Sequence, residues 1–165
     1  RPQHPAGADR HRPDHLMLRN ILVAVDGSPA SGEPLAHAVE LARRCDAALT
    51  GLFIIDNQWA DFIGNDWQSA AGARQGFLDY MAQEQEGQSL KARGQFLAAV
   101  EGLPGAEFLV RVGDPQAVLL EAAQVPDTDL LILSRRVFAV AGRPSLKGLA
   151  AHLAKRAGRP LMVLP

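Results

Sequence analysis

Residues 20–28 read Asn-Ile-Leu-Val-Ala-Val-Asp-Gly-Ser, an unbroken apolar run followed at once by turn-forming residues. Because apolar and polar side chains do not alternate, Ile21–Val25 is predicted to be a strand buried on both faces, as in a parallel sheet. The next residues, Asp26–Pro29, favour a turn. Ser31 is then expected to cap a helix. Cys45 lies on the apolar stripe of that helix, so we expect its thiol in the core.

The same alternation of apolar strand and amphipathic helix continues to the end of the chain. It predicts a three-layer, Rossmann-like α/β domain, a five-stranded parallel sheet with helices on both faces. The longest helix is predicted over 74–101, with Gly87 and Gly94 as places where it could bend, and its charged and glutamine-rich positions are expected to face solvent. The other strands are predicted at Leu49–Ile55, Phe108–Val112, Asp129–Leu133 and Leu161–Leu164. The apolar face of the longest helix is expected to consist of Phe77, Met81, Leu90, Leu97 and Val100.

Residues 57–73, between the second strand and the longest helix, show no clear hydrophobic period. They are predicted to form a long loop or a broken helix, a common place for binding or dimer contacts. The segment carries three large aromatic residues, Trp59, Phe62 and Trp67. These side chains could cover a pocket or simply pack beneath the loop.

The composition fits one globular domain and excludes several classes of partner. A chain of 165 residues with 47% apolar residues can bury a substantial core. Its formal net charge of −1 gives no reason to expect nucleic acid or an anionic membrane as a partner, and no apolar run is long enough to span a bilayer. Cys45 is the single cysteine, so no intrachain disulfide can form and a reducing, cytoplasmic setting is expected. Residues 1–18, rich in Pro and His, are predicted to be a flexible tail before a domain at 19–165, and their histidine spacing fits no metal site.

Ligands of such sheets bind beyond the carboxyl ends of the strands, and segments near those ends carry a family resemblance. Residues 20–28, 113–115, 129–133 and 159–165 are similar, in order and at suitable spacing, to universal stress proteins. The resemblance implies the strand order 3-2-1-4-5 and pairing of the last strand with its copy in a second subunit. An apolar edge strand also needs a partner to avoid aggregation. We therefore expect a homodimer with an interface made by Leu161, Met162, Val163 and Leu164.

The resemblance also implies an adenine-nucleotide site. In nucleotide-binding members, an aspartate ending the first strand contacts adenine and an apolar residue of the second strand walls the base; Asp26 and Ile54 hold these positions. The phosphates lie against a G-x2-G-x9-G-[ST] loop after the fourth strand. Here the three glycine positions and the final hydroxyl position carry Ser134, Val137, Lys147 and Gly148. The candidate residues for ATP or another adenine nucleotide are Ala24, Val25, Asp26, Ile54, Gly113, Leu133, Ser134, Arg135, Arg136, Val137, Lys147, Gly148 and Leu149.

The missing glycines weigh against phosphate binding, and nearby positive charge weighs for it. Glycines let backbone N–H groups approach phosphate and permit positive φ, whereas Val137 brings a β-branched side chain. Arginines beside a helix N-terminus still form an anion site, and the last helix is expected to begin at a Ser145 cap. The basic residues near this start are Arg135, Arg136, Arg143 and Lys147. Two alternatives are open: these charges could only face solvent, and Asp26 could only serve its own turn.

No catalytic set emerges from the sequence. A G-x-S-x-G elbow, a Walker G-x4-G-K-[ST] motif and a metal cluster are all missing from it, and His37 and His152 are expected on helix surfaces or interfaces. Slow ATP hydrolysis is the most that the fold suggests. Three functions remain: a stress-response regulator that binds unidentified protein partners and has a degenerate nucleotide site, a functional ATP-binding domain, or a dimerisation module without nucleotide.

Overall fold

The computed structural model describes residues 17–67 and 72–165. Strands and helices alternate along this part of the chain as the sequence predicts, and the predicted tail lies outside it except for Met17 and Leu18. The strands are β1 (Asn20–Ala24), β2 (Ala48–Asp56), β3 (Ala106–Gly113), β4 (Leu130–Ser134) and β5 (Leu161–Leu164). The helices are η2 (Pro29–Ser31), α1 (Gly32–Cys45), α2 (Trp59–Ile63), α3 (Ala73–Ala99), α4 (Pro115–Gln124), η3 (Pro144–Leu146) and α5 (Leu149–Arg156).

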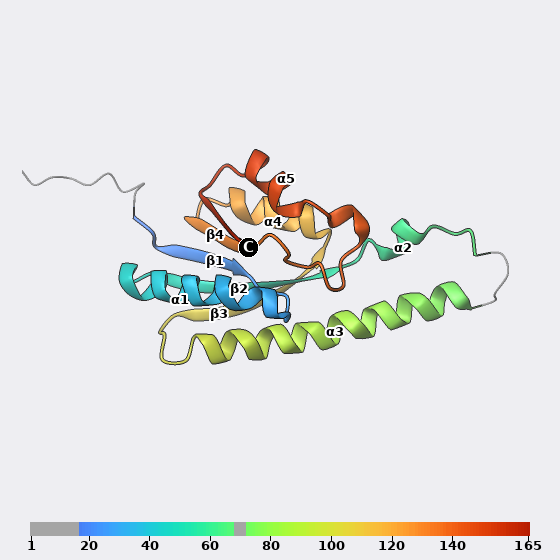
Figure 1. Cartoon of the computed structure of the whole chain (residues 1–165), viewed down its shortest axis with the longest axis horizontal. Helices are drawn as coiled ribbons and strands as arrows, with labels where there is room; N and C mark the ends of the chain where they lie inside the picture. Colours follow the sequence, from blue (N-terminus) through green and yellow to red (C-terminus); the bar gives the residue numbers. More distant parts are fainter. Residues whose placement is uncertain (1–16, 68–71) are drawn as a thin grey trace, which may run out of the picture.

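The five strands form one parallel sheet in the order β3-β2-β1-β4-β5, which confirms the predicted fold class. Helices α1 and α3 lie on one face and α4 and α5 on the other (Figure 1). The order places β1 at the centre of the sheet, where the chain changes the direction in which it adds strands. Crevices at such a switch point are the usual ligand sites of open parallel sheets.

Burial falls from the centre of the sheet toward its edges. All five residues of β4 and the last four of β1 are buried, as expected of strands covered on both faces. The edge strand β3 is far more open, with Val112 63% exposed and Val110 44% exposed. Helices therefore cover both faces of the sheet, as predicted, and the edge strand β3 is covered less completely than the centre.

One prediction about the helices next to the sheet is wrong in detail. Cys45 is exposed, not buried in the core, because it is the last residue of α1 and the chain leaves the helix at Asp46 in a left-handed conformation. Helix α3 runs unbroken through Gly87 and Gly94. None of the helices within 17–67 and 72–165 combines the length and the apolar character needed to cross a membrane.

The buried face of α3 also differs from the predicted one. Leu90 is 67% exposed and Leu97 is 52% exposed. Met81, Ala92 and Phe96 are buried, and so is a polar residue, Gln85. The long helix therefore carries a sparse apolar face, and one glutamine lies where the sequence predicts only solvated side chains.

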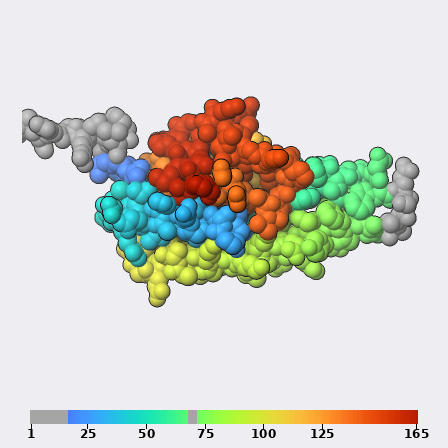
Figure 2. Space-filling view, viewed as in Figure 1, coloured from blue at the N-terminus to red at the C-terminus, as the bar shows by residue number. Residues whose placement is uncertain are grey.

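The aromatic residues after β2 pack against one another on an extension of the domain. The ring of Trp59 meets the rings of Phe62 and Phe77 edge-on, with centroids 5.7 and 5.8 Å away, and Trp67 lies 6.0 Å from Phe77. Helix α2 and the first turns of α3 project beyond the rest of the molecule (Figure 2). These aromatic rings therefore pack against one another, and Trp59 also lines a hollow between α2 and α3. The predicted segment 57–73 contains α2, and its residues 68–71 lie outside the described part of the chain.

Candidate functional site

The carboxyl ends of β1, β2, β3 and β4 bring four loops together on one side of the sheet. In the register of the sheet, Asp56 at the end of β2 pairs with Gly113 at the end of β3. Asp114 follows directly and caps α4, accepting a hydrogen bond from the N–H of Ala117. The turn after β1 and the loop after β4 complete the edge. This is the place where the sequence predicts ligand contacts.

The carboxylate of Asp26 is buried and serves the protein's own backbone and hydroxyl groups. Asp26 is only 2% exposed. Oδ1 accepts hydrogen bonds from Ser28 N–H at 2.9 Å and from the hydroxyls of Ser28 and Ser31 at 2.7 Å each. Oδ2 accepts a hydrogen bond from the N–H of Phe138 at 2.9 Å. Ser31 holds the predicted N-cap position of α1, but its side chain makes no capping hydrogen bond, because its hydroxyl is bonded to Asp26.

Phe138, in the loop after β4, holds an unusual backbone conformation. Its φ is +61°, in the left-handed region that residues with a side chain seldom adopt. The residue is 7% exposed, and its ring meets Phe53 edge-on with centroids 5.9 Å apart. The loop thus places an aromatic ring above the sheet and an N–H group on Asp26. Val137, where the sequence predicts an obstacle to a left-handed turn, is itself buried, and its neighbour takes the positive φ.

Arg143 joins two carboxylates at the edge of the sheet. Its Nε donates to Asp56 Oδ2 at 2.6 Å, and a terminal nitrogen donates to Asp114 Oδ1 at 2.5 Å. The side chains of Arg143 and Asp56 are 9% and 4% exposed, so the pair is largely shielded from water. Burial alone would lower the pKa of Arg143, but the hydrogen bonds and charges of Asp56 and Asp114 outweigh it and raise the pKa above its ordinary value. The guanidinium therefore stays charged, and its position is fixed.

Gln85 on α3 holds the end of β2. Its amide oxygen accepts a hydrogen bond from Asp56 N–H, and its amide nitrogen donates to the carbonyl oxygen of Asp56 at 3.0 Å. The glutamine thus supplies both bonds that a neighbouring strand would supply. The other carboxylate oxygen of Asp56 accepts from the N–H of Gln58 at the start of α2. Asp56 is therefore fixed in place by its backbone and its side chain.

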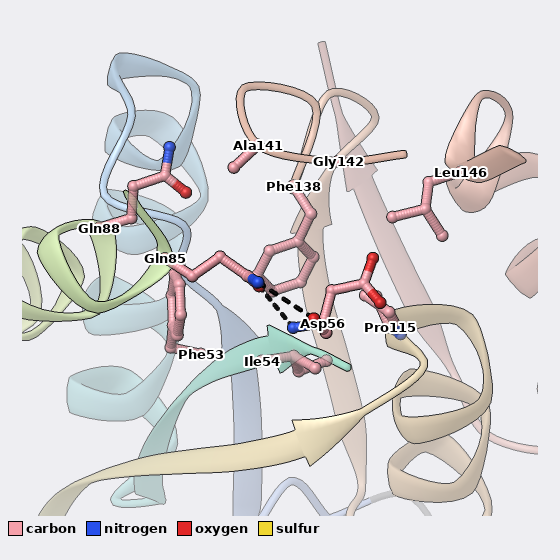
Figure 3. Close-up of a pocket in the computed structure, with 10 residues that line it drawn as sticks. All are labelled: Phe53, Ile54, Asp56, Gln85, Gln88, Pro115, Phe138, Ala141, Gly142 and Leu146. Atoms are coloured by element: carbon pink, nitrogen blue, oxygen red, sulfur yellow. Dashed lines mark hydrogen bonds between the residues drawn. The ribbon is translucent and has the colours of Figure 1, made fainter. Parts of the chain in front are cut away.

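A small cavity lies among these groups, as Figure 3 shows. Phe138 points into it from the loop after β4, Ile54 and Phe53 form part of its wall, and Gln85 reaches across to Asp56 (Figure 3). Its volume is about 10 Å³, which is about the space that one water molecule needs. In this arrangement the cavity is far too small for a purine base.

A larger hollow lies on the outer side of the same loop. Its volume is about 400 Å³. Arg135, Arg136 and Lys147 are exposed there, and Gly148, the residue before α5, has a φ of +84°. The hollow is lined by Arg135, Arg136, Val137, Ala139, Gly142, Arg143, Pro144, Leu146, Lys147 and Gly148. Three exposed cations around such a hollow can bind an anion such as a phosphate.

The structure brings one part of the predicted nucleotide site together and separates another. Most residues predicted to contact phosphate line the larger hollow, namely Arg135, Arg136, Val137, Lys147 and Gly148. Ser134 does not line it. Ser134 serves its own turn, because its hydroxyl accepts from Arg136 N–H and donates to the carbonyl oxygen of Pro165. Ile54 lines the small cavity and Asp26 lines neither space. The other predicted residues, Ala24, Val25, Gly113, Leu133 and Leu149, line neither space.

Two further predictions concern the start of the last helix. Ser145 does not cap it: η3 intervenes, α5 begins after Gly148, and the Ser145 hydroxyl accepts from Arg143 at 3.0 Å. Arg143 was predicted to add charge around the helix start, yet it turns inward to the two aspartates.

Sequence reasoning does not predict the contacts made at this site by Phe138, by Gln85 and by the two aspartates bound to Arg143. Acidic residues directly after two parallel strands, with an arginine in a third loop, are a signal that could have predicted the ion pairs. The apolar run 137–141 within a loop could have indicated a segment that folds inward. Nothing local distinguishes Gln85 from the exposed glutamines around it.

Comparisons with known proteins match the family and the fold of this chain. A model of the universal stress protein family matches residues 17–165. The structure resembles universal stress protein UspA from Lactobacillus plantarum, with 24% identity, a TM-score of 0.61, and coverage of 89% of this chain and 97% of that one. It resembles the universal stress protein from Archaeoglobus fulgidus in complex with dAMP at 14% identity, a TM-score of 0.56, and coverage of 91% and 100%. A family member from Arabidopsis thaliana with AMP bound is 18% identical, with a TM-score of 0.54 and coverage of 88% and 90%. Among curated protein sequences, none matches this chain.

Proposed function

This chain belongs to the universal stress protein family, and from that premise we propose that it is a stress-response regulator that acts as a homodimer on protein partners, with a degenerate adenine-nucleotide site. The observation that carries the proposal is that the chain itself occupies the place expected for adenine, with Phe138 bound to Asp26 and only a small cavity left next to the ring of Phe138. The carboxylate expected to meet adenine accepts four hydrogen bonds from the chain itself. The cavity that Phe138 and Ile54 line measures about 10 Å³.

Relatives with bound nucleotide give the contrast for this proposal. The Archaeoglobus fulgidus protein is in complex with dAMP, and the Arabidopsis thaliana protein has AMP bound. In this chain the glycine positions of the family's phosphate loop carry Ser134, Val137 and Lys147. Glycine matters there because a side chain keeps backbone N–H groups away from phosphate. A site that lacks both the base pocket and the glycine loop is better suited to a regulator that works through its surface.

The homodimer is part of the proposal because of the edge strand β5. It pairs with β4 on one side, and its sequence is Leu-Met-Val-Leu, with Val163 40% exposed. An apolar edge strand is open to pairing with a second chain. Pairing with its own copy would be isologous and would close the assembly at two subunits. We place this dimer in the cytoplasm, since the single cysteine fits a reducing compartment.

A second candidate, a functional ATP-binding protein with slow hydrolysis at most, is favoured by the larger hollow. Its volume of about 400 Å³ and its exposed Arg135, Arg136 and Lys147 suit a chain of phosphates. In that case the phosphates would supply most of the binding free energy. The base would have to lie outside the small cavity.

Calorimetric titration of the purified full chain with ATP and Mg²⁺ separates the two candidates. The regulator proposal predicts no measurable heat at millimolar ATP and no adenine absorbance in the purified protein. Micromolar binding would contradict it. If the loss of Arg135, Arg136 and Lys147 to alanine then removes the binding, while the matched surface change Arg44→Ala leaves it, the ATP-binding candidate takes its place.

A further inference from the structure

The loop after β4 forms a compact lobe, residues 138–142, whose two ends are fixed to the sheet edge. Its chain closes tightly on itself, because a Cβ at Gly142 would lie 2.1 Å from the carbonyl oxygen of Phe138. Only glycine permits so close an approach. Val140, at the tip of the lobe, is 69% exposed. The tip of the lobe is therefore exposed to solvent, and its base packs against the sheet.

The first end of the lobe combines a polar and an aromatic contact. The N–H of Phe138 donates to Asp26 Oδ2 at 2.9 Å, and the ring fills the space beside Phe53. Adenine likewise combines a hydrogen-bond donor, its amino group, with a flat ring. In the expected nucleotide arrangement, that donor would meet the same aspartate.

The second end is the Arg143 ion pair. The guanidinium connects the end of β2, through Asp56, with the residue after β3, Asp114. Removing a cation from such a shielded pair leaves two carboxylates facing each other, which is strongly unfavourable. The lobe is therefore held by two independent contacts, one on each side of its base.

We propose that the lobe is an internal occupant of the base pocket, and that Phe138 and Arg143 decide whether an adenine nucleotide can enter. This inference rests on the proposed function, which takes the cleft to be a nucleotide site that has become degenerate. It adds that the pocket is closed by a removable segment of the chain and is not permanently filled. A nucleotide can bind only in the fraction of molecules in which the lobe has moved outward, so its apparent affinity is reduced by that fraction.

Titration of the full chain with AMP, the smallest probe that carries the base and one phosphate, tests the inference. Phe138→Gly removes the ring, keeps the N–H group and suits the positive φ. Arg143→Gln releases the other end of the lobe. Each variant is expected to bind AMP at least about tenfold more tightly than the parent chain, because the open fraction rises. The matched controls, Phe62→Ala and Arg44→Gln, alter an exposed aromatic residue and an exposed arginine and are expected to leave the affinity unchanged.

The ratio of the variant and parent affinities decides this inference, and the parent affinity alone decides the proposed function. If folded Phe138→Gly and Arg143→Gln chains bind AMP no more tightly than the parent, the inference is overturned, whether or not the parent binds. A tight parent with still tighter variants would keep the inference and overturn the degenerate site.

Hydrogen exchange gives a readout without ligand, and it remains decisive if Phe138→Gly fails to fold. The Phe138 amide should be protected in the parent chain and should exchange at least about tenfold faster in Arg143→Gln, as local opening becomes easier. Arg44→Gln should leave its rate unchanged. Exchange of the Phe138 amide in the parent as fast as that of Val140 at the exposed tip would overturn the inference.

Discussion

At the scale of single residues, Asp26 shows how one carboxylate can organise the edge of a sheet. It follows β1, at the centre of the sheet, and it accepts hydrogen bonds from two different loops. A buried carboxylate is tolerated only when several donors compensate for its lost hydration. Here the compensation comes from the chain, so the residue has a structural role in this conformation. Contact with adenine stays a prediction.

Asp26→Ala should destabilise the fold as well as alter the site. It would leave the buried N–H groups of Ser28 and Phe138 without their acceptor, and each such loss costs about 1–3 kcal/mol. We expect the free energy of unfolding to fall by at least about 2 kcal/mol in urea titrations. Asp127→Ala, at an exposed aspartate, should change it by less than about 0.5 kcal/mol. A fully stable Asp26→Ala chain would contradict the hydrogen-bond network.

At the scale of elements, Gly51 in β2 determines how α3 packs, because a glycine leaves room for a large side chain. An added Cβ at Gly51 would lie 2.6 Å from Cδ2 of Phe96, a fully buried ring of α3. Phe96 in turn packs against Phe108 of β3, with ring centroids 5.6 Å apart. Because Leu90 and Leu97 are exposed, the packing of α3 depends on this contact, on the buried Met81 and on the two hydrogen bonds between Gln85 and Asp56.

Gly51→Ala and Gly94→Ala should have opposite effects on stability. The first forces a methyl group into the ring of Phe96 and should cost about 1–3 kcal/mol. The second places a methyl group on an exposed helix position with nothing within 4 Å and should stabilise by about 0.5–1 kcal/mol. Thermal and urea unfolding measure both. Equal effects of the two changes would show that backbone propensity, and not packing, dominates at Gly51.

At the scale of the whole molecule, the two edge strands of the sheet differ in length and in charge. The edge strand β5 is short and apolar, whereas β3 has eight residues and carries the charged Glu107 and Arg111. Charged residues on an edge strand discourage pairing with another chain. This difference favours β5 as the side on which two copies meet.

Val163→Asp should convert the expected dimer into a monomer. The new carboxylate would face its own copy across the isologous contact, where like charges repel and apolar area is lost. Light scattering at micromolar concentration measures the mass. Val112→Asp, at the exposed edge β3, is the matched control and should leave the dimer intact. A parent chain that is monomeric under these conditions would rule out the dimer.

The sequence by itself determined the strands, their parallel arrangement and the edge at which the site lies. These features follow from local patterns: apolar runs without alternation, turn residues after each run, and helical spacing between them. The ends of helices were predicted less well, as Cys45 and Ser145 illustrate. A helix ends where tertiary contacts no longer stabilise a further turn, and such contacts are not visible in the local sequence. The family resemblance rests on the same local patterns, because these patterns specify the fold and not the binding of a particular ligand.

Only the tertiary structure decided what fills the site. The bond from Phe138 to Asp26 spans 112 positions of the chain, and the pair of Arg143 with Asp56 spans 87. No local pattern fixes such partners, because they depend on how far a loop folds back over the sheet. The loop's inward course depends on a left-handed Phe138 and a close approach at Gly142, both imposed by packing. Whether the arginines of that loop face solvent or a carboxylate is likewise settled by burial, which the sequence does not encode residue by residue.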